Sequence, residues 1–579
     1  MYIQKLKIEN YRNLDGLEIK FHEEITFIVG ENNLGKSNVL SLINTIFNYP
    51  SFKFEDFSNK EKEINIYLSL MLNDEEKGMF DDFFDPENNN RLNLIVSQES
   101  PDENIEFKHE ESETRLSNNV LKKVLHINYN SSVRSPTNEL NFEKGRGTGK
   151  FLKFIIKKYK EDINADELDY VNQEKLNDLT KYTNDIIKKL NSFNGFDIKA
   201  SIHNEAEDLL SRILVLTDSE ELDVQSSGHG VQYSLIIGLA ILERLSSLNS
   251  KKLNEMLYKN VIDDNALSTI FTLDEPEIHL HPYMQRSLIK NVFNIVHNRD
   301  SNFKSLLKSL FNIEELNGQV IVVTHSPNIL LNNYNQIIRF HRKNDKLQVF
   351  NGADLNLSEK NEKHLMMNMQ YIKEIFFAKY VVIVEGDSEY GAMEIFADRL
   401  GIDLDSQGIS ILKADGAESI TPLIVLLKHF GINSVGVMDK DKYGDGKKYS
   451  EFKNLFSTKT KDFEEEIFSI CEEKDNLEII FDIVKNNDDK GLRYSVQKSK
   501  LVKTAKSYGI DISNIEIKDY RFNEIGNNRV LLKLMFFAWG DSNKSVVLGK
   551  GIADNLNSEL IPTVYKEALE SAKGGFSWE

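Results

Sequence analysis

Two sets of short motifs, each placed where an apolar stretch ends, constrain the fold of this sequence most strongly. The first set begins with Gly-Glu-Asn-Asn-Leu-Gly-Lys-Ser at residues 30–37, which satisfies the phosphate-binding pattern G-x-x-x-x-G-K-S. The uniformly apolar run 25–29 precedes this loop, as expected of a buried central strand, and apolar residues at helical spacing follow from Ser37. Strand, loop and helix in this order predict an α/β domain that binds a nucleoside triphosphate.

The loop supplies most of the predicted nucleotide contacts. Its backbone N–H groups can cradle phosphates, Lys36 can reach the β- and γ-phosphates, and the hydroxyl of Ser37 can ligate Mg²⁺. The predicted ATP-binding residues of the loop are Gly30, Asn32, Asn33, Gly35, Lys36 and Ser37.

Two later apolar runs end in residues that suit the same site. Residues 270–273 lead into Asp274 and Glu275, and residues 320–323 lead into Thr324 and His325. We expect Asp274 to hold Mg²⁺ through water, Glu275 to polarise the attacking water, and His325 to contact the γ-phosphate. The alternative for the acidic pair is a strand end that caps a helix.

A glycine-rich segment at 226–232 opens a helix, and its N–H groups, including those of Gly228 and Gly230, can bind the γ-phosphate across a dimer interface. His279 and His281 are two residues apart, but no cysteine or further histidine lies nearby to complete a metal site. We therefore expect this histidine pair to serve packing and a loop at a dimer interface.

The second set of motifs is rich in carboxylates. The apolar run 381–384 ends in Glu385-Gly386, and the run 435–438 ends in Asp439-Lys440-Asp441. Alternation along a strand predicts that Asp439 and Asp441 share one side, and parallel strands would bring Glu385 beside them at the carboxyl edge of a sheet. Carboxylates without thiols or imidazoles favour Mg²⁺ or Mn²⁺ over zinc.

Length and charge bound the remaining possibilities. A chain of 579 residues is too long for one core and predicts several domains. Its net charge of −20 argues against a protein that binds DNA over most of its surface, so any nucleic-acid contact must use a local basic surface or bound metal.

The single cysteine, Cys471, allows no intramolecular disulfide and is expected to be an inert core residue. The absence of a signal pattern or a long apolar run predicts a cytoplasmic protein without a membrane partner.

The first set of motifs resembles a known group of ATPases. Ile8-Glu-Asn-Tyr-Arg-Asn-Leu14 followed by the phosphate-binding loop is similar to the start of RecF/SMC-type ABC ATPases, and Asp274 follows Lys36 at a comparably long separation. Members of that group work as head-to-head dimers, which implies that segment 226–232 contacts the nucleotide of the partner. Arg134 resembles an arginine of this group, although a surface salt bridge is the alternative.

The second set resembles a TOPRIM domain, the metal-binding fold of topoisomerases, primases and some nucleases. The ordered elements are Glu385-Gly386, Asp415-Gly416 and Asp439-Lys440-Asp441. An ABC ATPase followed by TOPRIM is similar to the OLD nuclease family and to the nuclease subunit of Gabija anti-phage systems. This resemblance implies a further metal ligand at Glu389, which completes an E-G-x-x-E pattern with Glu385.

The resemblance also implies a later acidic ligand and a lysine. Glu464 is the preferred candidate in the acidic run 462–466, with Asp462 and Glu466 close behind, and a charged helix start is the alternative for this run. For the lysine, Lys550 in Gly-Lys-Gly is preferred to Lys500, which is closer to the Gabija form. The implied catalytic residues are Glu385, Glu389, Asp439, Asp441, Glu464, Lys550 and, for ATP, Glu275; the implied metal ligands are Ser37, Asp274, Glu385, Glu389, Asp439, Asp441 and Glu464.

Together these features predict an α/β protein with an ABC-type, RecF/SMC-like ATPase domain, a helical insertion, a TOPRIM domain of Rossmann-like fold and a helical C-terminal region. The expected boundaries are 1–150 and 221–350 for the ATPase, 151–220 for an insertion that mediates dimerisation, and 375–579 for TOPRIM with its helical region. A polar stretch at 343–365 is the candidate linker.

The predicted function is an ATP-binding, Mg²⁺- or Mn²⁺-dependent DNA endonuclease that nicks or cleaves in anti-phage defence, with the nucleotide gating the nuclease. Its expected partners are DNA, further copies of the chain in a homodimer or larger oligomer, and, for a Gabija-type subunit, a UvrD-like helicase. The alternative is a DNA-repair or chromosome-maintenance ATPase with little or no nuclease activity.

Overall fold

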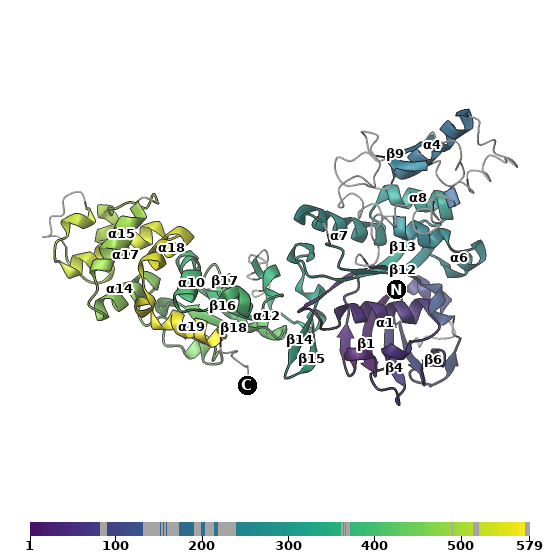
Figure 1. The fold of residues 1–579 in the computed structure, drawn as a ribbon, viewed down its shortest axis with the longest axis horizontal. Helices are drawn as coiled ribbons and strands as arrows, with labels where there is room; N and C mark the ends of the chain where they lie inside the picture. The colour runs from purple at the N-terminus through teal and green to yellow at the C-terminus, as the bar shows by residue number, and fades with distance from the viewer. Residues whose placement is uncertain are drawn as a thin grey trace. The chain divides into compact units, whose positions relative to one another are not determined.

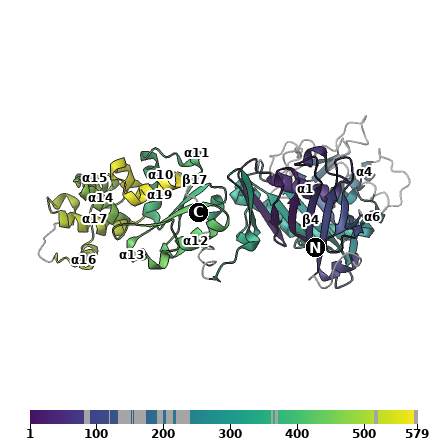
Figure 2. The same cartoon turned by 90° about the horizontal axis from the view of Figure 1, so that it is seen from below.

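The chain divides into two units, Met1–Leu355 and Asn356–Glu579, and each is described by itself. Figures 1 and 2 show the elements of both units in a computed structural model. The structure describes residues 1–80, 90–117, 119–130, 151, 154–155, 158, 173–189, 199–202, 214–217, 239–278, 280–359, 363, 365, 371–488, 490–512 and 520–573.

The first unit contains a mainly parallel sheet that carries the phosphate-binding loop. Its strand order is β11-β12-β13-β3-β14-β15, with β8 also paired to β12. Its strands are β3 (Ile25–Gly30), β8 (Leu125–Asn130), β11 (Leu257–Lys259), β12 (Asn265–Asp274), β13 (Glu315–Val323), β14 (Ile337–Lys343) and β15 (Lys346–Asn351). All six residues of β3 are buried between its parallel neighbours β13 and β14, which accounts for their uniformly apolar character.

A second, antiparallel sheet lies on the other side of the core of this unit. Its strand order is β2-β1-β4-β5-β6-β7. The strands are β1 (Tyr2–Glu9), β2 (Glu18–Lys20), β4 (Ile64–Met71), β5 (Arg91–Gln98), β6 (Glu106–His109) and β7 (Arg115–Leu116). Inward-facing residues of this sheet share one apolar core with helix α1 (Lys36–Asn48) and with residues such as Ile270 and Ile321 of the parallel sheet. The core therefore fixes α1, and the loop before it, against the parallel strands.

Further helices and strands complete the first unit. They are α6 (Ser250–Met256), α7 (Pro282–Val296) and α8 (Ser301–Phe311), with α4 (Gln173–Ile187), β9 (Lys199–Ile202) and β10 (Leu214–Thr217) in the region expected to be a helical insertion. Strands β9 and β10 pair in antiparallel fashion, so the described part of the predicted helical insertion contains strands as well as helix α4. Its role in dimerisation stays a prediction. The short apolar run Leu-Val-Leu-Thr in β10 has the composition of a strand, which the surrounding Lys- and Asn-rich sequence conceals.

The predicted linker also needs a correction at its start. Residues 346–351 form β15, which pairs with β14 as a hairpin around Asn344 and Asp345, both of which have positive φ. Two consecutive left-handed residues make a tight turn, so the polar residues there mark a hairpin tip. The division between the units falls after Leu355. Arg134, Gly228, Gly230 and His279 lie outside the described residues.

The second unit is built on a parallel sheet of order β17-β16-β18-β19. Its strands are β16 (Tyr380–Val384), β17 (Ile409–Lys413), β18 (Asn433–Met438) and β19 (Leu455–Ser457); the helices that alternate with them are α10 (Asp387–Arg399), α11 (Leu404–Gln407), α12 (Ala417–His429) and α13 (Lys440–Tyr443). The strand–helix alternation predicted for residues 380–438 is confirmed, and it places the ends of β16 and β18 side by side.

Helices from the C-terminal part of the chain cover this sheet and form their own layer. They are α14 (Phe463–Glu473), α15 (Glu478–Asp488), α16 (Lys498–Ser507), α17 (Arg529–Asn543), α18 (Val546–Asn555) and α19 (Thr563–Lys573). One continuous apolar core joins β16 and β18 to these helices, with Trp539 fully buried in it. Cys471 belongs to the same core, and burial raises the pKa of its thiol to about 12, as expected of an inert cysteine.

Candidate active site

The phosphate-binding loop has the local geometry that its motif predicts. Gly30 has a φ of 138°, and a Cβ there would lie 2.3 Å from the carbonyl oxygen of Phe340, so only glycine fits between β3 and β14. Gly35 caps the N-terminus of α1 with a φ of 87°. The loop and its neighbours line an open cavity of about 1080 Å³, whose walls include Asn32, Asn33, Lys36, Ser37, Glu275 and His325.

Ser37 and Asp274 meet directly in this first site. The Ser37 hydroxyl donates to Asp274 Oδ1 at 2.9 Å, and Asn130 Nδ2 donates to Asp274 Oδ2 at 2.9 Å. The side chains predicted to hold Mg²⁺ are therefore adjacent, although 237 residues separate them. Lys36 is buried and donates to the carbonyl oxygens of Gly30 and Glu31, and this burial lowers its pKa to about 8. Anionic phosphates in the cavity would restore the charged form of Lys36.

A second pair of residues, Glu275 and His325, meets where β12 and β13 end. His325 Nε2 lies 3.2 Å from Glu275 Oε1, and Glu275 has a φ of 49°, a left-handed conformation that is uncommon for residues other than glycine, asparagine and aspartate. The backbone N–H of His325 donates to Glu277 Oε1 at 2.6 Å. Glu277 lines the cavity and was missed in the sequence. It fixes the loop that carries His325.

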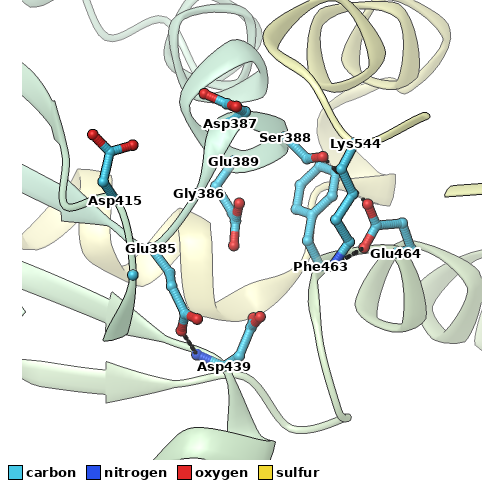
Figure 3. Close-up of a pocket in the computed structure, with 11 residues that line it drawn as sticks. Glu385, Gly386, Asp387, Ser388, Glu389, Asp415, Asp439, Phe463, Glu464 and Lys544 are labelled. Carbon is cyan, nitrogen blue, oxygen red and sulfur yellow. Dashed lines mark hydrogen bonds and ion pairs between the residues drawn. The ribbon is translucent and has the colours of Figure 1, made fainter. Parts of the chain in front are cut away.

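In the second unit, the ends of two neighbouring parallel strands bring Glu385 and Asp439 together. Glu385 directly follows β16 and Asp439 directly follows β18, and the backbone N–H of Asp439 donates to Glu385 Oε2 at 3.2 Å. Figure 3 shows the carboxylates of Glu385, Glu389 and Asp439 around a common space. This space belongs to a cavity of about 330 Å³ lined by Glu385, Gly386, Asp387, Ser388, Glu389, Asp415, Gly416, Asp439, Phe463, Glu464 and Lys544.

Two helix starts add the remaining carboxylates of the cavity. Glu389 lies in the first turn of α10, and Glu464 lies in the first turn of α14. Both are buried, with exposed fractions of 6% and 3%, and the hydroxyl of Ser388 donates to Glu464 Oε1 at 3.2 Å. Helix N-termini favour negative charge, which partly offsets the cost of burying these two carboxylates.

The acidic run 462–466 divides into three different roles. Asp462 caps the N-terminus of α14 by accepting from the Glu465 N–H, and Glu466 accepts from the Thr460 hydroxyl at 3.0 Å. Only Glu464 of the three lines the cavity. Asp441 does not line it either. Because β18 ends at Met438 and residues 440–443 turn into α13, strand alternation does not continue to Asp441. The assignment of Asp441 as a metal ligand stays a prediction.

Burial and mutual repulsion disfavour the charged forms of the four cavity carboxylates. Burial is the largest cause for each, and it raises the pKa of Glu385 and of Glu464. The pKa of Glu389 rises to about 7, with Glu464 and Glu385 as further causes, and that of Asp439 rises to about 9, with Glu389 and Glu385 adding to burial. A cation in the cavity would relieve this repulsion.

The lysine of this cavity is Lys544, which was missed in the sequence. It lies between α17 and α18, and its Nζ is 3.7 Å from Glu464 Oε2. Burial lowers its pKa, but Glu464, Asp462 and Asp439 together raise it above the ordinary value, so Lys544 stays charged at neutral pH. Lys550 is exposed on α18 and Lys500 pairs with Asp541 at 3.4 Å, and neither lines the cavity.

The glycines around Lys550 have a structural purpose. A Cβ on Gly549 would lie 1.8 Å from the carbonyl oxygen of Ser388, and one on Gly551 would lie 1.7 Å from Asn487 Oδ1. A Cβ on Gly391 would likewise lie 2.1 Å from the Val546 carbonyl oxygen. The glycines let α10 and α18 approach closely, and this contact places Ser388 and Lys544 at the cavity. Gly-Lys-Gly is thus a helix-packing motif here.

The residues of the second cavity fit a divalent cation by their chemistry. Four carboxylates supply the oxygen donors that Mg²⁺ and Mn²⁺ prefer. The hydroxyl of Tyr565 on α19 is buried without a hydrogen-bond partner in the described part of the chain. Burial raises its pKa, and the nearby Glu389 and Asp439 raise it further. Within the described ranges, no three Asp, Glu, His or Cys side chains stand close enough to form a finished metal site. Carboxylates that repel one another would need the cation itself to draw them together.

Comparison with known families identifies the protein class. The family model of the AAA ATPase domain matches residues 1–330. That of the overcoming lysogenization defect protein-like (OLD-like) TOPRIM domain matches residues 376–441. The chain belongs to the OLD family of ATPases that carry a TOPRIM domain. These matches confirm the predicted family, fold class and enzyme class. The ATPase domain of this OLD-family protein implies ATP, and its TOPRIM domain implies a divalent metal.

The relatives of this OLD-family protein are distant in sequence. Endonuclease GajA of Bacillus cereus (strain HuB5-5) is 23% identical, over 79% of this chain and 79% of its own length. The OLD nuclease of Thermus scotoductus is 22% identical, over 76% of this chain and 82% of its own length. The Old nuclease of Escherichia phage P2 is 24% identical, over 54% of this chain and 52% of its own length. Among the described residues, no helix is long and apolar enough to cross a bilayer.

Proposed function

We propose that this protein is a metal-dependent DNA endonuclease whose activity is regulated by ATP. The observation that carries the proposal is the convergence of Glu385, Glu389, Asp439 and Glu464 on one cavity beside Lys544. Two of these carboxylates, Glu389 and Glu464, are buried and the other two are half-buried. Placing four carboxylates so close together costs stability unless a cation binds them, and hydrolytic sites that use divalent metals require such a group of ligands. The names of the relatives, Endonuclease GajA and Old nuclease, support the same activity.

The four carboxylates would hold Mg²⁺ or Mn²⁺, which when bound supplies an activated water and stabilises the leaving oxygen of a phosphodiester. Hydrogen bonds within the chain orient two of these carboxylates toward the cavity. The Asp439 N–H orients Glu385, and the Ser388 hydroxyl orients Glu464. Lys544 offers a positive charge next to Glu464, where it can offset the negative charge that develops on the phosphate during cleavage.

ATP would act from the first unit, where Lys36 and Ser37 bind its phosphates and Mg²⁺. In RecF/SMC-type ATPases a second protomer completes the nucleotide site, so we propose a homodimer or larger assembly whose geometry follows nucleotide binding and gates the nuclease. The resemblance to Gabija nuclease subunits supports a role in anti-phage defence, with a UvrD-like helicase as a further partner.

A cleavage assay tests the proposal. Purified protein is incubated with supercoiled plasmid or linear DNA in Mg²⁺, Mn²⁺ or EDTA, with and without ATP. We expect nicked or cut DNA in either metal, none in EDTA, and a rate that depends on ATP. Intact DNA in both metals, at every ATP concentration, would leave an ATPase without nuclease activity.

The nucleotide part of the proposal predicts a separate result for Lys36→Met. Loss of a charged donor to phosphate should weaken binding of a fluorescent ATP analogue roughly 10- to 100-fold. Cleavage of DNA should persist in this variant but stop responding to ATP, because Lys36 lies in a different cavity from the carboxylates. Lys53→Met is the matched control, since Lys53 is 75% exposed and lines neither cavity. An unchanged ATP response in Lys36→Met would contradict gating through this site.

A further inference from the structure

We propose that the loop between the two acidic residues Asp439 and Asp462 binds the phosphodiester backbone of the DNA substrate. This loop, residues 440–461, is called the lysine loop below. It carries Lys440, Lys442, Lys447, Lys448, Lys453, Lys459 and Lys461, all exposed, against Asp441, Asp445 and Glu451. The inference rests on the proposed nuclease function and adds the surface that holds the substrate.

Both ends of the lysine loop are fixed next to the carboxylate cavity. The Lys440 N–H donates to the Thr458 hydroxyl at 2.7 Å, and the Asp441 N–H donates to the Lys461 carbonyl oxygen at 3.4 Å. Parallel pairing of Met438 with Ser457 brings the strand before the loop beside the strand near its end. The lysines at both ends therefore lie within a few residues of Asp439 and Glu464, which line the cavity.

The middle of the lysine loop is held by two tyrosines. The rings of Tyr443 and Tyr449 stack with centroids 5.5 Å apart, and Tyr449 is buried. Gly446 has a φ of 74°, and a Cβ on it would lie 2.6 Å from the Tyr443 ring, so the chain closes tightly around the aromatic pair. A loop folded in this way presents its lysines without a large ordering cost on binding.

The charges of the lysine loop are available to a ligand. The Nζ atoms of Lys442, Lys447 and Lys461 reach only acidic neighbours in sequence, at 3.3 to 3.5 Å, and such exposed pairs are weak. In the part of the chain that the structure describes, Lys448 and Lys459 form no ion pair.

The basic charge of the lysine loop contrasts with the acidic charge of the chain as a whole. The net charge of the protein is −20, so a DNA-binding nuclease needs a local basic surface next to its catalytic residues. The lysine loop supplies one whose ends adjoin the cavity. An acidic protein could also bind exposed lysines, but the adjacent carboxylate cavity favours a phosphodiester, because both features would contact one substrate.

The test replaces four lysines of the loop that do not line the cavity, Lys447, Lys448, Lys453 and Lys459, with Gln in the full chain. The matched control replaces Lys474, Lys485, Lys503 and Lys506, which are exposed in the helical part of the same unit, with the same change in charge. A third variant carries Arg at the four loop positions, which keeps the charge. Thermal unfolding and circular dichroism establish that all three are folded.

Binding of a fluorescent 30-base-pair duplex is measured by anisotropy in EDTA over a range of KCl concentrations. We expect the loop Gln variant to bind at least about tenfold more weakly at 0.1 M salt, with a log–log salt slope reduced by about 2 to 4, since each phosphate contact contributes about 0.9. The Arg variant and the matched control should keep the wild-type slope. Equal slopes in the loop Gln variant and the matched control would overturn the proposal, and an acidic protein partner would then be the better candidate.

Hydrolysis of bis(4-nitrophenyl) phosphate with Mn²⁺ separates this proposal from the proposed function. This small diester needs the cavity but no extended surface, so the loop Gln variant should hydrolyse it at a rate within about twofold of wild type while its DNA cleavage falls at least about tenfold. A wild-type protein that cleaves neither substrate would refute the nuclease function, whereas the binding result in EDTA would still decide the role of the lysine loop.

Discussion

Replacing Asp439 with Asn should abolish metal-dependent DNA cleavage, with a loss of at least about a hundredfold in kcat, the scale seen when one preorganised group that stabilises charge is removed. Asn keeps the size of the side chain and the backbone N–H that donates to Glu385, so the fold should persist. What it removes is the carboxyl group that faces the cavity (Figure 3) and that could become an anionic ligand of the metal. The measurement is single-turnover cleavage of linear DNA in Mn²⁺, with ATP-analogue binding as a check on the first unit.

Asp441→Asn is the matched control for this prediction. The two aspartates are two residues apart and carry the same charge, yet only Asp439 lines the cavity. Burial is the main cause that raises the pKa of Glu385, and the exposed Asp441 adds to it, so loss of Asp441 should change kcat by no more than a few-fold, about the effect of one exposed charge. Equal inactivation by the two substitutions would mean that Asp441 moves into the site during catalysis, and that the observed position of the α13 turn is not the active one.

Replacing Lys544 with Ala should lower kcat for DNA cleavage roughly 10- to 100-fold and leave KM almost unchanged. The reason is that its charge is placed to stabilise the transition state rather than to bind the substrate uniformly. Lys544→Arg should recover part of the rate, because the charge is retained while the geometry changes. Both variants are assayed by steady-state cleavage at saturating Mn²⁺.

Lys550→Ala and Lys500→Ala are the controls for Lys544. Both lysines are candidates on sequence grounds, but Lys550 is exposed, Lys500 is half-buried beside Asp541, and neither lines the cavity. We expect near-wild-type cleavage from each. A large loss of kcat in Lys550→Ala, together with normal activity in Lys544→Ala, would show that the α17–α18 connection rearranges in the active enzyme and would restore the sequence-based assignment.

The strands of both units could be predicted because burial leaves a direct mark on the sequence. Runs such as 25–29 and 381–384 are apolar throughout, and the residues that follow them must lie at the carboxyl edge of a parallel sheet. The positions of Asp274, Glu385 and Asp439 followed from this rule, and that of Lys36 followed from the phosphate-binding pattern after the strand. Glu389 and Glu464 needed the family resemblance, since a carboxylate in the first turn of a helix is common for other reasons.

Other features could not be read from the sequence because tertiary contacts decide them. Lys544 lies in a short connection between two helices, where nothing in its neighbours distinguishes it from other surface lysines. Lys550 lies between Gly549 and Gly551, but these glycines allow the close packing of helices and do not mark a catalytic lysine. The prediction that Asp441 shares a side with Asp439 assumed that the strand continues to residue 441. No residue in the sequence marks the end of β18, which ends at Met438 before α13 begins at Lys440.

The central claim is that the carboxylates of the second unit hold divalent metal for phosphodiester cleavage. Anomalous diffraction from crystals grown with Mn²⁺ tests it most directly, because the signal locates the ion independently of activity. We expect Mn²⁺ bound among Glu385, Glu389, Asp439 and Glu464, and loss of this signal in Asp439→Asn. Crystals in which Mn²⁺ occupies the Ser37–Asp274 site but not the carboxylate cavity, even with DNA bound, would contradict it.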